Sequence, residues 1–213
     1  MALNAIACQI IAPHLKGDVL CLGVPIVLAT DAECEAYFGV KPKKKVRGPE
    51  WADYRETPDP YELFRLAGAK LTCVDAIAHD GRELVADLNY RQDLGQFDLV
   101  IDAGTTEHCF NVGQAIINAA NAVRVDGLIL HTNPVSMGNH GFYNFNPTLF
   151  VDFYRVNGFE IVGLEVRDRS GEGNREKINA TARFPMGNNW AMYCLARRLE
   201  RLPLQHPIQS KYL

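Results

Sequence analysis

The chain has 213 residues, with 22 Lys and Arg against 25 Asp and Glu, so its net charge is −3. This balance argues against a strongly basic nucleic-acid-binding protein. No apolar run approaches the ~18 residues that a membrane-spanning helix needs, and the first eleven residues lack the basic region typical of a signal peptide. The length predicts a single domain over residues 1–213, large enough to bury a sizeable core.

Strands and helices are predicted to alternate along the chain. In order, the sequence predicts a strand over 19–22, a helix over 31–38, a helix over 61–67, strands over 69–74, 83–87 and 97–102, a helix over 112–123, a strand over 128–132, a helix over 147–157, strands over 161–166 and 178–184, and a helix over 190–199. The last two strands flank a polar loop, 167–177, which is typical of a terminal antiparallel hairpin.

Capping residues support several of these boundaries. Thr30 and Glu33 have capping-box spacing, and Asp59 followed by Pro60 is a favourable helix start. We expect a core over about 17–185, an insertion over about 31–58 and a C-terminal helix over about 186–202. Within the insertion, residues 41–49 are basic and interrupted by prolines, which predicts a solvated loop or a contact with an anionic ligand.

The alternation predicts a parallel sheet covered on both faces, in which ligands bind at the carboxyl ends of the strands. The residues of interest therefore follow the strands: Gly23, Asp75, Asp87, 102–104 and 133–143. A carboxylate such as Asp75 can accept hydrogen bonds from both hydroxyls of a ribose, and Asp87 can accept one from an amine such as that of adenine. Either acid can instead simply cap a turn.

Four segments resemble, in order, motifs of the class I S-adenosylmethionine-dependent methyltransferases. They are FDLVID with TEH at 97–108, ANAVRVDGLIL at 120–130, NHGFYNFNP at 139–147 and NGFEIV at 157–162. The resemblance covers about residues 70–185. It implies an α/β, Rossmann-like methyltransferase fold: a mostly parallel seven-stranded sheet with a reversed C-terminal strand and helices on both faces.

The resemblance also implies S-adenosyl-L-methionine as the cofactor and roles for individual residues. Asp75 matches the acid that binds the ribose, and Asp87 with the backbone amide of Leu88 matches the adenine contact. The strand end from Asp102 to Gly104 matches the segment that borders the methyl donor.

The turn after the first strand departs from the family pattern, which is an acid followed by G-x-G-x-G. Here Cys21 stands at the acid position, and Gly23 is followed by Val24 and Pro25. Proline has a fixed φ and no N–H, which disfavours a tight glycine turn. Either cations of the 41–47 segment bind the methionine carboxylate, or residues 24–26 fill its place.

Methyl transfer requires alignment of donor and acceptor and often removal of a proton from the acceptor. His108 is a candidate base, although it can equally cap the following helix, and His140 is a second candidate. Glu107 matches a segment near which acceptors bind. Tyr143 and Asn144 are candidates to orient the acceptor, or they plug the end of the sheet.

Other chemistries receive little support. No His and acid cluster has metal-ligand spacing, so we expect no metal site, and His131, inside a strand, is expected to be a core residue. The P-loop and the dinucleotide fingerprint are absent. The cysteines form no C-x-x-C pair and are predicted to be buried and reduced in a cytoplasmic protein: Cys8, Cys21, Cys34, Cys73, Cys109 and Cys194.

Two functions remain open. The first is methyl transfer from S-adenosylmethionine to a small-molecule or glycan acceptor, with no membrane or nucleic-acid partner. The second is a methyltransferase-fold protein that has lost activity and serves as a binding or assembly subunit. Asp75, Asp87 and the Glu107–His108 pair favour the first, and the altered turn at 23–25 favours the second. The sequence specifies neither the methylated atom nor the oligomeric state.

Overall fold

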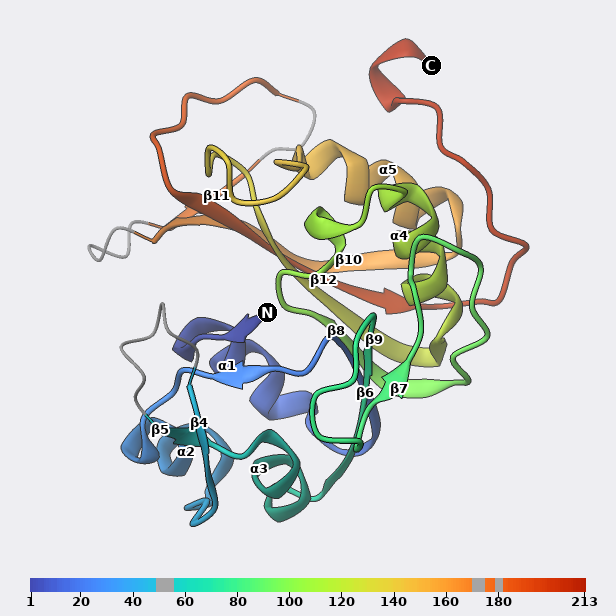
Figure 1. The fold of residues 1–213 in the computed structure, drawn as a ribbon. Coiled ribbons are helices and arrows are strands. Elements are labelled where there is room, and N and C mark those ends of the chain that lie inside the picture. The colour runs from blue at the N-terminus through green and yellow to red at the C-terminus, as the bar shows by residue number, and fades with distance from the viewer. Residues whose placement is uncertain (49–55, 170–174, 179–181) are drawn as a thin grey trace.

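The computed structural model describes residues 1–48, 56–169, 175–178 and 182–213, and an eight-stranded sheet runs through its centre (Figure 1). Its strands, in spatial order, are β11 (Arg175–Lys177), β10 (Phe159–Asp168), β12 (Trp190–Arg198), β9 (Val123–Pro134), β8 (Phe97–Asp102), β2 (Gly17–Leu22), β6 (Ala69–Asp75) and β7 (Leu84–Val85). The strands from β9 to β7 are parallel, and β12 is antiparallel to both β9 and β10. Apart from the short β11, this is the seven-stranded sheet with a reversed last strand that the sequence predicts.

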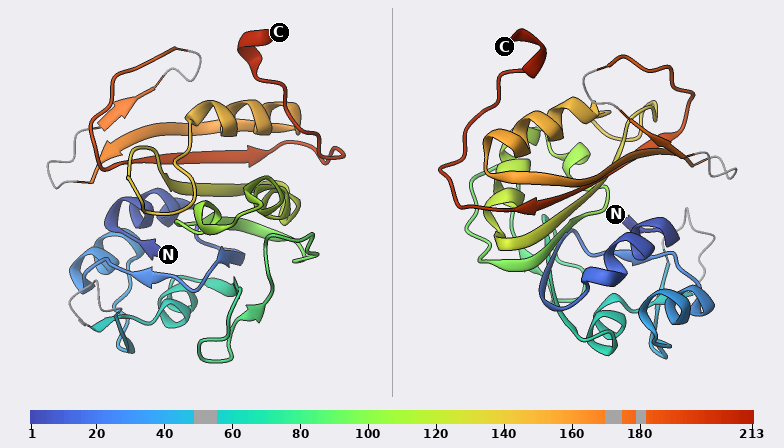
Figure 2. Two further views of the ribbon diagram at one scale, coloured as in Figure 1. Left: turned by 45° about the horizontal axis from the view of Figure 1, so that its top comes forward. Right: turned by 180° about the vertical axis from the view of Figure 1, so that it is seen from behind.

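Helices cover both faces of this sheet (Figures 1 and 2). α1 (Ala5–Ile11), α2 (Asp31–Phe38) and α3 (Pro60–Leu66) lie on one face, and α4 (Val112–Asn121) and α5 (Pro147–Val156) lie on the other. Each face has its own apolar core. Leu63 and Phe64 are fully buried in the first, and Ile116 and Phe150 are buried in the second.

Short elements complete the fold. β1 (Ala2–Leu3) pairs in parallel with β3 (Ile26–Val27), and β4 (Lys45–Arg47) pairs antiparallel with β5 (Glu56–Pro58). Single 3-10 turns cover Ala12–His14, Thr106–His108 and Ser210–Tyr212. The N–H of Ala2 donates to the carbonyl of Ala103 at 3.1 Å, so β1 lies beside the carboxyl end of β8.

The predicted caps are confirmed. The Thr30 hydroxyl accepts from the Glu33 N–H while the Glu33 carboxylate accepts from the Thr30 N–H, and Gly39 ends α2 with a left-handed φ of 69°. The Asp59 carboxylate accepts from the Glu62 N–H at the start of α3. All six cysteines are free and buried, as expected, and none of the described helices is long and apolar enough to cross a membrane.

The prediction of a C-terminal helix over 186–202, with its helical segment at 190–199, is wrong because Trp190–Arg198 is the strand β12. Residues 191–196 are buried on both faces between β9 and β10, and an apolar run of this kind does not distinguish a buried strand from a helix. β12 therefore replaces the predicted strand over 178–184 as the partner of β10. Residues 178 and 182–184 belong to no strand, and 179–181 lie outside the described residues.

Two predicted loops also contain strands. Residues 167–168 belong to β10 and 175–177 form β11, with 170–174 outside the described residues. In the insertion over 31–58, residues 45–47 form β4, and the described residues omit 49–55. The helix α1 was not predicted at all, although Asn4 caps it by accepting from the Ala7 N–H.

Candidate functional site

Two adjoining cavities lie at the carboxyl ends of the parallel strands. The first has a volume of about 650 Å³ and lies over the ends of β2, β6, β7 and β8, and the second has a volume of about 490 Å³ and lies over the ends of β8 and β9. Met1, Gly104 and His108 line both, so the two cavities meet after β8. Volumes of this size are typical of small-molecule and cofactor sites.

The turn after β2 forms one wall of the first cavity. Gly23 has a left-handed φ of 80°, and a Cβ there would lie 3.1 Å from the Thr105 hydroxyl oxygen, which itself donates to the Leu22 carbonyl. Val24, Pro25 and Ile26 line the same wall. The glycine therefore permits the close approach of the loop after β8. Cys21, directly before Leu22 on β2, is buried in the core.

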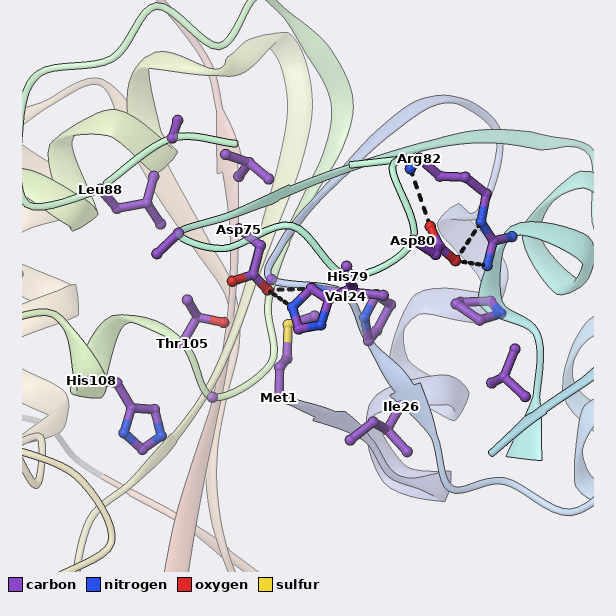
Figure 3. Close-up of a pocket in the computed structure, with 18 of the residues that line it drawn as sticks. Met1, Val24, Ile26, Asp75, His79, Asp80, Arg82, Leu88, Thr105 and His108 are labelled. Atoms are coloured by element: carbon purple, nitrogen blue, oxygen red, sulfur yellow. Dashed lines mark hydrogen bonds and ion pairs between the residues drawn. The ribbon is translucent and has the colours of Figure 1, made fainter. Parts of the chain in front are cut away.

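Asp75, at the end of β6, lies in the middle of the first cavity (Figure 3). Its Oδ2 accepts from the Val24 N–H at 3.2 Å and lies 3.1 Å from Nε2 of His79. Its side chain is 22% exposed, and that of His79 is 45% exposed. A ligand hydroxyl that binds this carboxylate therefore shares it with the Val24 amide and displaces or contacts the His79 ring.

The loop after β7 supplies Asp87 and Leu88 to the same cavity. The Asp87 carboxylate accepts from the backbone and side-chain N–H groups of Asn89. Asn118 of α4 fixes this loop from beneath, because its Nδ2 donates to the carbonyls of Leu88 and Tyr90 at 3.1 and 2.8 Å. The loop therefore has a defined shape without a regular element.

Asp102 does not line either cavity, which corrects its assignment as a cofactor contact. It is fully buried and accepts from the Thr106 hydroxyl at 2.6 Å and from Asn133 Nδ2 at 3.1 Å. Its Oδ2 also lies 2.8 Å from Nδ1 of His131, whose Nε2 lies 2.6 Å from the Tyr154 hydroxyl. Burial raises the pKa of Asp102, but the hydrogen bond from His131 and the others outweigh it and hold the pKa below its usual value. His131 is a buried core residue, as predicted.

Glu107, His108 and His140 converge where the two cavities meet. Oε1 of Glu107 lies 3.6 Å from Nε2 of His140, and the His108 and His140 ring centroids are 5.5 Å apart. Burial and the neighbouring Asp102 raise the pKa of Glu107 to about 7. Burial, followed by His140, lowers the pKa of His108, and burial, followed by Arg169, lowers that of His140. Both shifts favour the neutral form of the imidazole.

Tyr143 and Asn144 line neither of these two cavities, which corrects their assignment to the acceptor. The Tyr143 hydroxyl donates to the Phe110 carbonyl at 2.8 Å, and the Asn144 side-chain oxygen accepts from the Met137 N–H at 2.8 Å. Both side chains therefore hold the loop after β9 in place.

The basic segment reaches the first cavity through Arg47 and not through its lysines. Lys41, Lys44 and Lys45 form ion pairs with Glu35, Asp59 and Asp31, respectively. Val46, Arg47 and Gly48 line the cavity. Arg47 is therefore the cationic residue of this segment that lines the first cavity.

Sequence reasoning missed His79, Thr105, Asn118 and Asn133. Asn133 falls directly after a predicted strand, and this position is the signal that identifies it as a residue of the strand ends. His79 and Asn118 carry no such signal, since one lies in an irregular loop and the other on a helix.

A comparison with protein-family models found no match, and neither did a search of curated proteins. Among solved structures, the 1,6-didemethyltoxoflavin-N1-methyltransferase of Burkholderia thailandensis, which contains 1,6-didemethyltoxoflavin and S-adenosylhomocysteine, is similar over 92% of this chain and 77% of its own, with a TM-score of 0.53 and 17% identity. The MccD protein is similar over 90% of this chain and 96% of its own, with a TM-score of 0.50 and 12% identity.

TehB from Haemophilus influenzae is similar over 85% of this chain, with a TM-score of 0.48 and 14% identity, and this chain spans 57% of its length. The strand order with its reversed β12, together with the likeness to the Burkholderia thailandensis structure, shows that this chain has the Rossmann-like fold of the class I methyltransferases.

Proposed function

We propose that the chain transfers a methyl group from S-adenosylmethionine, bound in the first cavity, to a small-molecule or glycan acceptor bound in the second. The observation that carries this proposal is the common border of the two cavities at Gly104 and His108. A sulfonium at the end of β8 would point its methyl group across this border. Because the sulfonium is already an activated methyl donor, the protein mainly has to align the acceptor with it.

The first cavity offers groups suited to each part of the cofactor. Asp75 can accept from the ribose hydroxyls, and Asp87 and Leu88, which line the same cavity, can contact the adenine. Arg47 lines the same cavity, and a guanidinium is suited to a carboxylate because it can donate two parallel hydrogen bonds. We assign the methionine carboxylate to this side, in place of the glycine turn that the family uses.

The altered turn at 23–25 favours an inactive subunit, and one arrangement that it allows is that Val24, Pro25 and Ile26 fill the place of the methionine moiety. These residues form a wall of a cavity of about 650 Å³, so the space beside them stays open. This openness supports cofactor binding by a turn with one glycine.

Replacing Asp75 by alanine is expected to weaken the binding of S-adenosylhomocysteine about 10–100-fold, or about 1.4–3 kcal/mol, because two charge-assisted hydrogen bonds to the ribose are lost. Isothermal titration calorimetry on both proteins measures this change. Asp93→Ala is the matched control, since Asp93 is an exposed acid outside the cavity. Equal affinities for wild type and Asp75→Ala, with unchanged circular dichroism, would remove Asp75 from the site.

Replacing Arg47 by alanine is expected to weaken the same binding about threefold to tenfold, since an exposed ion pair contributes about 1 kcal/mol. The wild-type affinity should also fall as salt rises, and the variant should show a smaller fall because the screened charge is gone. Lys43→Ala is the control, because Lys43 lies in the same segment but does not line the cavity. If Lys43→Ala and Arg47→Ala have the same effect, the carboxylate binds elsewhere.

A further inference from the structure

The cluster at the border of the two cavities has the composition of a metal site. Glu107 and His108 come from the 3-10 turn after β8, and His140 comes from the loop after β9. One ligand atom from each lies within 4.8 Å of the other two, and the Glu107–His140 pair is 3.6 Å apart. Ligand atoms around a tetrahedral zinc ion are separated by about 3.4 Å, so small side-chain rotations suffice to bring the three onto one ion.

The Glu107 carboxylate is fixed and lacks one partner. The residue is fully buried, and its Oε2 accepts from Asn133 Nδ2 at 3.0 Å. Its Oε1 is buried and has no hydrogen-bond partner among the described residues, although it faces His140. A buried acceptor without a partner is unfavourable, and a bound cation removes this penalty. The hydrogen bond from Asn133 orients the carboxylate, and residues that orient metal ligands in this way are common around metal sites.

Two glycines keep the space around these ligands open. A Cβ on Gly104, whose φ is 87°, would lie 3.1 Å from Oε1 of Glu107. A Cβ on Gly141 would lie 2.9 Å from the Glu107 carbonyl oxygen and 3.2 Å from Nδ1 of His108. The Phe142 N–H donates to the same Glu107 carbonyl at 2.9 Å, which fastens the loop that carries His140. The backbone is therefore shaped to bring the three side chains together.

We propose that Glu107, His108 and His140 bind a divalent transition-metal ion, with zinc the best match, and that its open position faces the second cavity. Two imidazoles and one carboxylate are a ligand set of catalytic zinc sites, in which a fourth position stays available for water or substrate. Imidazole favours zinc and its neighbours over magnesium and calcium, which prefer oxygen ligands alone. Glu107 and His140 line the second cavity and His108 lines both, which places the ion on the acceptor side.

This site specifies the acceptor class, a step that rests on the proposed methyl transfer. A metal ion lowers the pKa of a bound hydroxyl group, so it suits an oxygen acceptor. The hydroxyl proton passes to solvent, the acceptor oxygen forms a bond to the methyl carbon, and the carbon–sulfur bond breaks. The sulfonium thereby becomes the neutral thioether of S-adenosylhomocysteine, and charge is conserved by the released proton. We therefore infer O-methylation of a hydroxylated small molecule or glycan.

The test is a calorimetric titration of zinc chloride into the full chain after treatment with a chelator. Wild type is expected to bind one zinc ion per chain, and His140→Ala and Glu107→Gln are expected to bind it at least tenfold more weakly. His206→Ala is the matched control and should bind as wild type does, because His206 is exposed and distant in sequence from the cluster. His79→Ala should also bind as wild type, which separates this cluster from the pair with Asp75.

Unchanged zinc affinity in folded His140→Ala, or no zinc binding by wild type, would overturn the metal site. If Glu107→Gln does not fold, His140→Ala carries the test, since the His140 side chain is 41% exposed. Titration with S-adenosylhomocysteine separates the two proposals. Cofactor binding without zinc binding removes the metal site alone, and zinc binding without cofactor binding removes the methyl transfer alone.

Discussion

Replacing Asp102 by alanine is expected to lower the free energy of unfolding by about 3–5 kcal/mol, the typical cost of removing one partner from a buried charged network. Asp102 is fully buried and bonds to the Thr106 hydroxyl, the Asn133 amide and the His131 ring. A carboxylate only accepts, so Nδ1 of His131 donates to it, while Nε2 of the same ring lies 2.6 Å from the Tyr154 hydroxyl. Without the carboxylate, the Thr106 hydroxyl and Nδ1 of His131 lose their buried acceptor.

Urea unfolding of Asp102→Ala and wild type, followed by circular dichroism, measures this loss. Asp98→Ala is the matched control, because Asp98 lies on the same strand but is 39% exposed and pairs with Arg124 at the surface. The free energy of unfolding of the Asp98→Ala control is expected to fall by about 1 kcal/mol. A similar loss in both variants would mean that the buried network contributes nothing beyond an ordinary surface pair.

Replacing His140 by alanine is expected to reduce kcat about 10²–10⁴-fold while the affinity for S-adenosylhomocysteine stays within twofold of wild type. His140 lines the second cavity and not the first, so in the proposed reaction it lies on the acceptor side. In that reaction its imidazole activates the acceptor, either as a base or as a ligand of the proposed metal ion. His108→Ala should show a similar loss in kcat, with some loss of cofactor affinity because His108 lines both cavities.

The rate is measured as release of S-adenosylhomocysteine with hydroxylated acceptors found by screening. His206→Ala is the control and should leave kcat unchanged, because that exposed residue lies in the C-terminal segment. A His140→Ala variant with wild-type kcat would place proton removal and metal binding elsewhere.

Helix-capping residues correctly predicted where two helices begin. The Thr30–Glu33 capping box and the Asp59–Pro60 start both appear where the sequence places them, because a cap depends on residues within one turn. The segment 190–198 was misread because its burial on both faces comes from β9 and β10, which are distant in sequence. Hydrophobic periodicity depends only on the residues of the segment itself, so it does not show that the segment packs between two strands.

Part of the candidate site was also predictable from the sequence. Asp75 and Asp87 follow predicted strands, and because parallel strands end at one edge of the sheet, both residues were expected there and both line the first cavity. Asp102 ends a strand in the same way, but it faces the core, where His131 of β9 contacts it and Tyr154 of α5 in turn contacts His131. A strand end fixes the position of a residue and not the side to which it points.

The convergence of Glu107 and His140 was also hidden from the sequence. The two residues are 33 positions apart, and their contact depends on the close approach that Gly141 allows. The prediction that no cluster has ligand spacing considered only neighbours along the chain, so it did not include pairs that loops bring together.

Titration of S-adenosylhomocysteine into the purified wild-type chain measures whether the chain binds the cofactor product. We expect one bound molecule per chain with a dissociation constant of about 1–100 µM, equivalent to about −5.5 to −8 kcal/mol. No binding at millimolar ligand, with the protein folded, would contradict it and would mean that the cavity of about 650 Å³ beside Asp75 serves another ligand.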